Sequence, residues 1–250
     1  IMDDMIDLGI DAKHSNEDII APFDQWIELY GSRIGLLGGI DVDLLRGLPR
    51  LRETAQELIQ IAQALGASPE SSVILGTAAT KPKVTSTDLS QYRVLAFATH
   101  GLLPGELRCQ AEPALALTPP ATPSPADNGL LDASDIAQFR LDADWVVLSA
   151  CNTAGPDGAL GGESLSGLAR AFFYAGARTL LVSHWAVASQ STVALTTGLF
   201  TEYAKDRALG RAEALRRAQQ ALWKETATAH PALWAPFVLV GDGGPESRQP

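Results

Sequence analysis

The sequence has few cysteines, no long apolar run and no excess of positive charge. Its 250 residues include two cysteines, Cys109 and Cys151, too few for the disulfide framework of a small secreted domain. No apolar run reaches the roughly 18 residues that a membrane-spanning helix requires, and no signal peptide opens the chain. We therefore expect a cytoplasmic protein that has no membrane span.

The acidic balance and the missing glycine motifs exclude further classes. A net charge of −10 argues against direct nucleic-acid binding, which needs a positively charged surface. The chain lacks a P-loop and the glycine spacing of a dinucleotide-binding loop, and we expect no cofactor. His14, Glu17 and Asp18 cluster in "HSNED", which we interpret as a solvated helix start, so we expect no metal.

Apolar segments of strand and helix character alternate over most of the chain. Four β-rich runs stand out: 92–99, 145–150, 178–184 and 236–241. Near-continuous apolar strands are typical of a parallel sheet that is covered on both faces. Helical patterns occupy residues 48–67, 164–177, 188–206 and 210–225. This alternation predicts an α/β fold with a mainly parallel central sheet and helices on both sides.

Other parts of the chain have distinct patterns. Residues 71–76, "SSVILG", predict a short strand, and residues 112–129 predict a hairpin with a long proline-rich surface excursion. In the last helix, Arg211, Arg216 and Arg217 are interpreted as a solvated face. The first 46 residues are acidic, and "RIGLLGGID" (33–41) could serve as the strand before the helix at 48–67.

Three reactive side chains follow predicted strands: His100, Cys151 and His184. If those strands are parallel, all three lie at one edge of the sheet, where functional residues of such folds collect. An imidazole can activate a thiol as a nucleophile. Gly101 lets a substrate approach the backbone, so the N–H groups of Gly101 and Cys151 could hold an oxyanion, and we prefer His100 as the base. The alternative for Cys151 is a buried inert thiol, and a structural role for His184 is equally open.

Several blocks together resemble the CHAT domain, a bacterial branch of the caspase-like peptidases, over about residues 48–244. The blocks include "YRVLAFATHGLLPGE", "DADWVVLSACNTAG" and "GGESLSGLARAFFYAGARTLLVSHWAV". The resemblance implies a caspase-like α/β/α sandwich and a cysteine endopeptidase whose dyad is His100 and Cys151. It also implies a protein or peptide substrate, and a sensor module such as tetratricopeptide repeats acting from another molecule.

The resemblance further implies a charged pocket near the same edge, where a carboxylate would bind a basic substrate residue before the cut. The candidate lining residues are Asp132, Asp135, Asp157, Glu163, His184 and Trp185. Asp135 and Glu163 could instead serve at helix starts, where carboxylates are favourable. Cys109 lies in a polar stretch and is interpreted as a bystander thiol.

Residues 1–46 resemble a fragment of the uroporphyrinogen decarboxylase family, whose fold is a β/α barrel. About 45 residues supply at most two β/α units, so that family's activity does not follow. We therefore expect two parts, with residues 1–46 interpreted as a fusion remnant and residues 47–250 as a CHAT domain. The main alternative to a peptidase is a catalytically silent interaction or signalling module.

Overall fold

The computed structural model describes most of the region expected to form the CHAT domain and two short pieces before it. The described residues are 12–14, 35–37, 45, 48, 51, 53–104, 107, 110–124, 126–149, 167–185 and 189–245. Cys109, Cys151, Asp157 and Glu163 lie outside these ranges. No helix in the described ranges is both long enough and apolar enough to cross a membrane.

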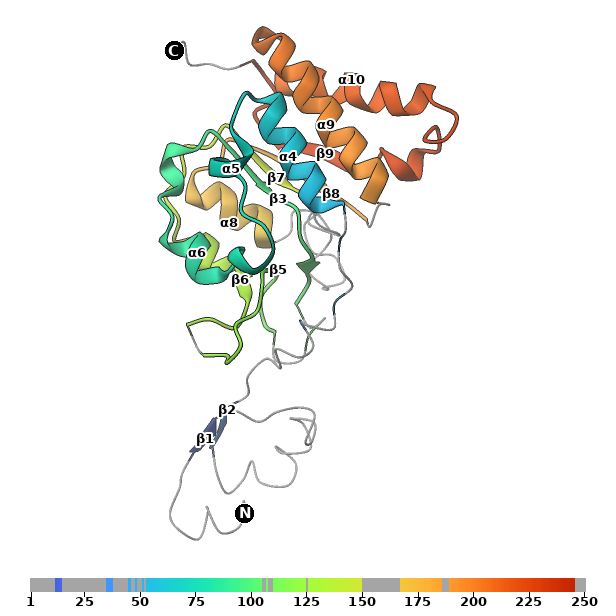
Figure 1. Ribbon diagram of the computed structural model, residues 1–250. Coiled ribbons are helices and arrows are strands. Elements are labelled where there is room, and N and C mark those ends of the chain that lie inside the picture. The colour runs from blue at the N-terminus through green and yellow to red at the C-terminus, as the bar shows by residue number, and fades with distance from the viewer. Residues whose placement is uncertain are drawn as a thin grey trace.

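A four-stranded sheet forms the centre of the fold (Figure 1). Its strands, in spatial order, are β3 (Val94–Phe97), β7 (Trp145–Leu148), β8 (Thr179–Ser183) and β9 (Phe237–Gly241). β3, β7 and β8 are parallel, and β7 and β8 are buried along their whole length, as predicted. The mainly parallel α/β class is thus confirmed.

The fourth strand departs from the expected parallel arrangement. β9 pairs with β8 in the antiparallel direction, in register from Thr179↔Gly241 to Ser183↔Phe237. It is an edge strand of the described sheet and is only partly buried, which suits an antiparallel strand. The apolar content of a segment indicates that it is buried, but it does not indicate whether the strand runs parallel or antiparallel to its neighbour.

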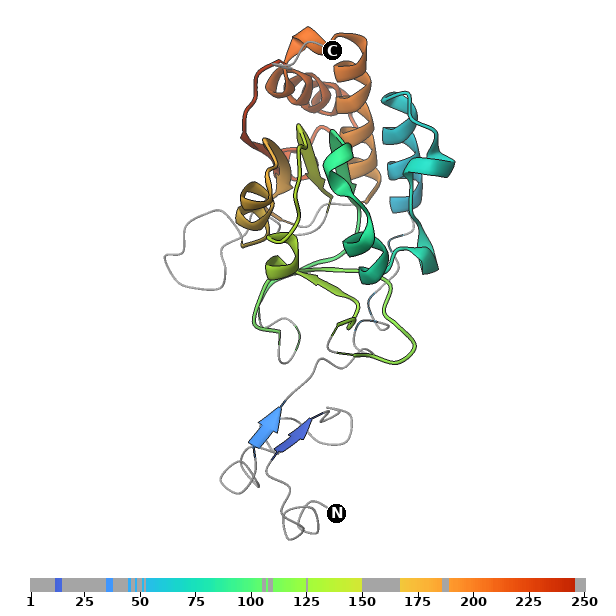
Figure 2. The same cartoon turned by 90° about the vertical axis from the view of Figure 1, so that its left-hand side faces the viewer.

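Helices cover both faces of the sheet (Figure 2). One face packs against α8 (Gly167–Ala175), around Phe172. The other packs against α4 (Thr54–Ala64), α9 (Ser189–Lys205) and α10 (Arg211–Lys224). On that side the Trp145 ring contacts Phe200 and Tyr203, with centroids 5.3 and 5.5 Å apart. The result is an α/β/α sandwich.

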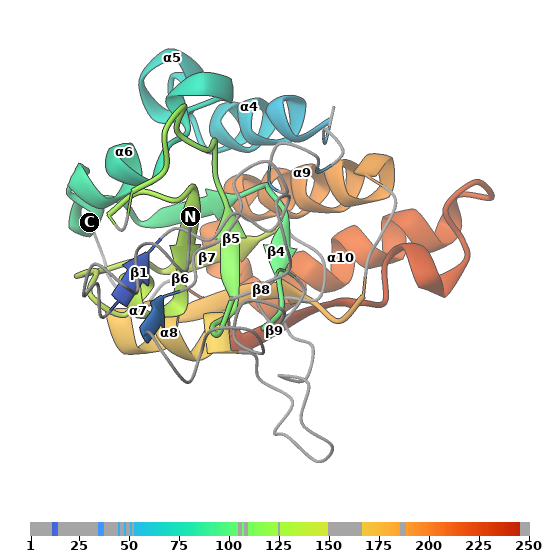
Figure 3. The same cartoon turned by 90° about the horizontal axis from the view of Figure 1, so that it is seen from below.

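A second, antiparallel sheet lies across one end of the central sheet (Figure 3). Its strands are β4 (Gly101–Leu102), β5 (Ala114–Ala116) and β6 (Leu130–Asp132), and α7 (Ala133–Ile136) follows directly. β5 and β6 pair in register Leu115↔Leu131, so the hairpin expected around the proline-rich segment is confirmed.

The chain between α4 and β3 forms short helices and no paired strand. These are α5 (Pro69–Ser72), η1 (Gly76–Ala78), α6 (Lys81–Ser86) and η2 (Leu89–Gln91). The prediction of a strand at 71–76 is therefore wrong. Val73 and Leu75 have extended backbones, but no described strand pairs with them. A strand needs a neighbour to satisfy its backbone groups, and sequence pattern does not supply one.

The two N-terminal pieces form a small parallel sheet of β1 (Ala12–His14) and β2 (Gly35–Leu37), in register Lys13↔Leu36. His14 is the last residue of β1, and residues 15–18, the rest of the segment interpreted as a helix start, lie outside the described residues. β2 lies within the segment 33–41 that was expected to form a strand. The remaining elements are η3 (Arg207–Leu209) and η4 (Pro231–Leu233), which flank α10.

Arg211 does not lie on a solvated face as expected. Its side chain is 1% exposed, and Nη2 lies 3.4 Å from Oδ1 of Asp144. Asp144, which is itself buried, also bonds Arg178 at 3.2 Å and Arg93 at 2.5 Å. We call Asp144, Arg93, Arg178 and Arg211 the aspartate–arginine cluster. Arg216 and Arg217 are exposed and pair with Glu213, as a solvated face requires.

Candidate active site at the carboxyl edge of the sheet

Two neighbouring parallel strands lead to the predicted dyad. β3 and β7 pair with Phe97 opposite Leu148, the last residue of each strand. His100 lies three positions past Phe97, and Cys151 lies three positions past Leu148. Cys151 itself falls outside the described residues, whose last member on this strand is Ser149. Because β3 and β7 are adjacent and parallel, their carboxyl ends share one edge of the sheet.

The backbone at His100 is held by the second sheet. The N–H of Ala116 donates to the carbonyl of His100 at 2.9 Å, and the hydroxyl of Thr99 donates to the carbonyl of Ala116. His100 is partly buried. Because β5 fixes the chain on both sides of the Cα atom, the imidazole is carried by an ordered backbone segment.

Gly101 continues this segment as the first residue of β4, opposite Leu115. In an antiparallel ladder, hydrogen-bonded and non-hydrogen-bonded pairs alternate. The bond between Ala116 and His100 makes theirs a hydrogen-bonded pair, so the next pair, Gly101 and Leu115, is non-hydrogen-bonded. The N–H of Gly101 is therefore directed away from β5, as an oxyanion donor requires.

A buried carboxyl group lies directly below the end of β7. Glu57, in the first turn of α4, is 2% exposed. Its Oε2 accepts from the Ser149 hydroxyl at 3.1 Å, and its Oε1 accepts from the Thr196 hydroxyl of α9 at 3.0 Å. Burial raises the pKa of Glu57, and the hydrogen bonds from Ser149 and Thr196 oppose this rise. Three elements of the fold, α4, α9 and the end of β7, thus meet two residues before Cys151.

Sequence reasoning missed Glu57, although a signal was present. Glu57 precedes Ile61 by four positions, which places both on the same face of the helix, and Ile61 is buried. A carboxylate on the apolar stripe of an amphipathic helix indicates a buried, hydrogen-bonded group. Its partners could not be read from the chain, because Ser149 and Thr196 are far away in sequence.

His184 and Trp185 follow β8 at the same edge. The N–H of His184 donates to the carbonyl of Pro236 at 3.1 Å, and the indole N–H of Trp185 donates to the carbonyl of Ala232 at 3.2 Å. Trp185 is 43% exposed, and the His184 side chain is exposed as well. Both are therefore surface groups of this edge, anchored to the loop before β9.

Asp132 and Asp135 have partners within the fold. Nζ of Lys81, a buried residue of α6, lies 2.6 Å from Asp135 and 3.6 Å from Asp132. The two aspartates also form a capping box at the start of α7, the structural role foreseen for Asp135. Burial raises the pKa of Asp132 and Lys81 opposes this, while Asp135 and Glu112 add to the rise.

The described residues hold no group of three or more His, Cys, Asp or Glu side chains that could bind a metal ion. The groups at this edge are thus an imidazole, hydroxyls, a buried carboxyl and backbone N–H donors. Such a set can transfer protons and stabilise an oxyanion.

Comparison with known proteins identifies the domain. Residues 41–242 match the CHAT domain. The chain is 27% identical over 214 residues to tetratricopeptide repeat protein 28 of Mus musculus, and 25% identical over 214 residues to the protein of that name from Homo sapiens. Each alignment covers 74% of this chain and 8% of the relative, so the chain spans a small part of those proteins. The likeness of residues 1–46 to uroporphyrinogen decarboxylase stays a prediction. Because the match covers most of its length, the chain belongs to the CHAT domain family.

Proposed function

We propose that the chain is a cysteine endopeptidase with His100 and Cys151 as its catalytic dyad. One observation carries this proposal: β3 and β7 are adjacent and parallel, and the two residues stand equally far beyond the paired residues Phe97 and Leu148. Membership of the CHAT family supports the same assignment, because the family is caspase-like.

The proposed reaction uses groups of this chain alone. The imidazole of His100 takes the proton from the Cys151 thiol, and the thiolate attacks the carbonyl carbon of the scissile peptide. The N–H groups of Gly101 and Cys151 stabilise the oxyanion of the tetrahedral intermediate. Protonated His100 gives its proton to the leaving amine as the C–N bond breaks. Water, deprotonated by His100, then hydrolyses the thioester and frees the thiol.

The charged substrate pocket would take its acid from one of two remaining carboxylates. Lys81 neutralises charge on Asp132 and Asp135, which weakens both as partners for a basic substrate residue. Asp157 and Glu163 remain the candidate pocket acids, both on the segment that follows Cys151. Trp185 and His184 would form an exposed wall at the end of β8.

A partner module is proposed to regulate the peptidase activity. The two curated relatives are named for tetratricopeptide repeats, which favours the pairing of this type of domain with a repeat module. We propose that such a module, on another molecule or on a longer form of this protein, binds and gates the peptidase. Protein substrates and this module are thus the expected partners.

The test is cleavage of a peptide library combined with labelling by an electrophilic peptide probe for thiols. Cys151→Ala and His100→Ala should each abolish cleavage and leave the urea unfolding midpoint unchanged. Cys109→Ala is the matched control and should keep most of the activity. Preference for a basic residue before the cut, lost in Asp157→Asn or Glu163→Gln, would identify the pocket acid.

Two outcomes would reject the proposal. Undiminished cleavage in Cys151→Ala or His100→Ala would show that the dyad is misassigned. Slow and equal labelling of Cys109 and Cys151, with no cleavage even when a repeat module is added, would favour a silent interaction module.

A further inference from the structure

A cavity of about 1300 Å³ lies between the outer edge of β3 and the chain that surrounds it. We call this cavity the slot. Residues 92–100 form one wall, residues 73–76 form the opposite wall, and the apolar side of α4 closes it. Leu45, Leu48 and Leu51, which lead into α4, also line it. The slot is thus bounded by extended backbone and by aliphatic side chains.

The β3 wall is an open sheet edge within the described residues. β3 stands first in the strand order, with β7 as its neighbour. The N–H groups of Trp145 and Ser149 donate to the carbonyls of Arg93 and Phe97, at 3.0 and 2.9 Å. The N–H and C=O groups of successive residues point to opposite sides of a strand. Since Arg93 and Phe97 face β7, Val94 and Ala96 direct these groups away from β7, into the slot. Such an edge favours another strand.

The opposite wall has the same character. Val73 (φ −114°, ψ 125°) and Leu75 (φ −127°, ψ 158°) have strand-like backbones. Ile74, Leu75 and Tyr92 are among the exposed large apolar residues of the described chain, and all three line the slot. Thr118 ties this wall in place, since its N–H donates to the carbonyl of Ala79 at 2.8 Å and its hydroxyl to that of Gly76 at 2.7 Å. Two strand-like walls therefore face one gap.

We propose that a β-strand made of residues 33–38 of this chain docks in the slot and pairs with β3 and with residues 73–75. The segment reads "RIGLLG", and β2 already gives its centre a strand backbone. Figure 1 shows β2 beside β1, and the two strands pair over three residues. A two-stranded sheet has marginal stability on its own. A strand inside the slot would have a neighbouring strand segment on each side and would be covered by the apolar side of α4.

Chain connectivity favours this occupant over any other. Seven residue steps separate Gly38 from Leu45 at the slot, a reach of up to about 23 Å. α4 begins at the carboxyl edge of the sheet, because Glu57 in its first turn bonds Ser149. A strand that ends at that edge just before α4 runs parallel to β3, and α4 becomes the helical crossover that parallel strands require. The family match starts at residue 41, so this strand comes from the segment that precedes the match.

Docking would also affect the candidate site. Thr99 and His100 line the end of the slot at the carboxyl edge. A strand in the slot would therefore support the backbone that carries the imidazole. The docking proposal itself does not depend on catalysis, since it concerns only strand pairing.

Disulfide trapping in the full-length chain tests the proposal. In a Cys109→Ser, Cys151→Ser background, Ala96→Cys is combined in turn with cysteine at Ile34, Gly35, Leu36, Leu37 or Gly38, and oxidised products are mapped by mass spectrometry. We expect intrachain disulfides whose yield alternates about tenfold between successive positions, because successive side chains of a strand point to opposite faces. No intrachain disulfide at any position, or equal yield at all five, would overturn the proposal. Disulfides between two chains would assign the slot to a second copy and would overturn it equally.

Hydrogen exchange supplies a measurement without new cysteines. The amide of Ala96 should be protected in the full-length protein, and Leu36→Pro, which removes a backbone donor from the docking strand, should lower that protection by about a hundredfold. Leu8→Pro is the matched control in the same N-terminal segment and should leave it unchanged. An Ala96 amide that exchanges rapidly in the wild-type protein would contradict docking.

Discussion

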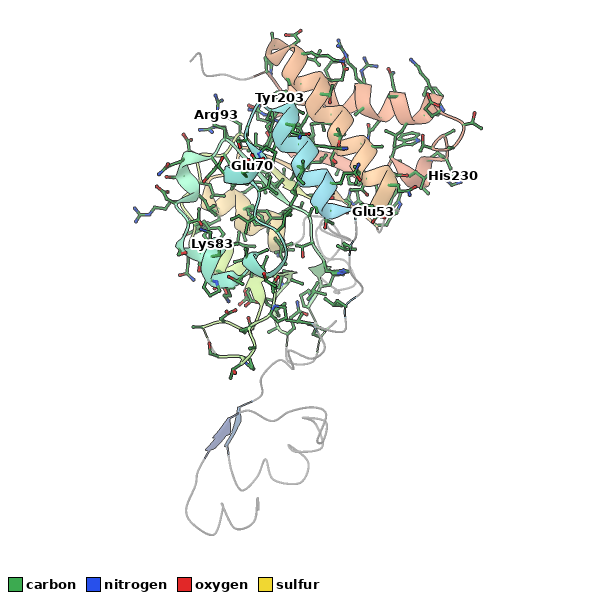
Figure 4. The ribbon with its side chains drawn as sticks, viewed as in Figure 1. Glu53, Glu70, Lys83, Arg93, Tyr203 and His230 are labelled. Carbon is green, nitrogen blue, oxygen red and sulfur yellow. The ribbon has the colours of Figure 1, made fainter. Side chains whose placement is uncertain are left out.

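The two ends of the central sheet are built from different chemistry. The amino end carries the aspartate–arginine cluster, in which buried Asp144 meets three guanidinium groups. The carboxyl end carries His100, Ser149 and the buried carboxyl group of Glu57, which bonds hydroxyls and not cations. In Figure 4, Arg93 lies at the upper left of the body, and Glu53, the residue before α4, lies lower and to the right. One end is fixed by permanent charges, and the other holds groups that can gain or lose a proton.

This difference separates stability from function within one sheet. Arginine stays charged at every accessible pH, so the guanidinium groups are permanent cations that hold β7, β8 and α10 together around Asp144. Hydroxyls and a carboxyl group of raised pKa can rearrange hydrogen bonds at little electrostatic cost. In parallel α/β sheets the carboxyl ends of the strands are the usual place for ligands. Changes at the amino end should therefore affect folding, and changes at the carboxyl end should affect chemistry.

The largest effect on stability is expected from Asp144→Ala. Removing this carboxylate leaves Arg211, which is 1% exposed, without its buried counter-ion. Loss of one partner of a buried ion pair costs about 3–5 kcal/mol, which a shift of the urea unfolding curve would report. Labelling of Cys151 per folded molecule should stay unchanged, because the cluster lies at the opposite end of the sheet.

Asp142→Ala is the matched control for that substitution. Asp142 bonds Arg178 at 2.6 Å, but its side chain is 46% exposed, so its loss should cost far less. Equal destabilisation by the two substitutions would mean that the cluster does not derive its strength from burial. Impaired labelling in folded Asp144→Ala would break the separation between the two ends.

A smaller, pH-dependent effect is expected from Glu57→Gln. The folded-state pKa of Glu57 lies above its unfolded value, so its contribution to stability is complete below about pH 4 and is lost as pH rises through the folded-state pKa. Glutamine keeps a hydrogen-bonding group in place and does not titrate. The difference in unfolding midpoint between the wild type and Glu57→Gln should therefore change with pH. The stability of the wild type relative to the variant should fall as pH rises.

Glu70→Gln provides the control, since this exposed glutamate has a lowered pKa. Its stability contribution must have the opposite sign of pH dependence, present above the unfolded pKa and lost as pH falls. A flat difference curve for Glu57→Gln across the acid range would show that the buried carboxyl group does not retain its proton longer than an ordinary glutamate.

Apolar runs and their periodicity predicted the core elements, but they did not predict the direction of every strand or the partners of the buried polar side chains. β7 and β8 were recognisable because their apolar runs are continuous, and α4 because its apolar residues recur at helical spacing. The direction of β9 was not predictable, since an apolar run at an edge has the same composition in either direction. The family resemblance was confirmed because several spaced blocks carried it together.

The sequence predicted where the candidate site lies, but not the hydrogen bonds and ion pairs of the buried side chains around the sheet. His100 was expected at a strand end, and the parallel β3 and β7 confirm that position. Arg211 and Glu57 were not expected to be buried, because both occur on helices whose polar residues usually face water. Their partners Asp144 and Ser149 are distant in sequence, so only the fold brings them together.

The smallest effect is expected from Glu213→Gln on the outer face of α10. Arg216 and Arg217 lower the pKa of Glu213 to about 2, and water reaches all three side chains. The contribution to stability is present above the unfolded carboxyl pKa and lost as pH falls, but solvent and salt screen it. The unfolding midpoint at neutral pH should match the wild type within error, in low and high salt alike. A clear loss would mean that ion pairs on this surface resist screening, and that burial does not explain the strength of the aspartate–arginine cluster.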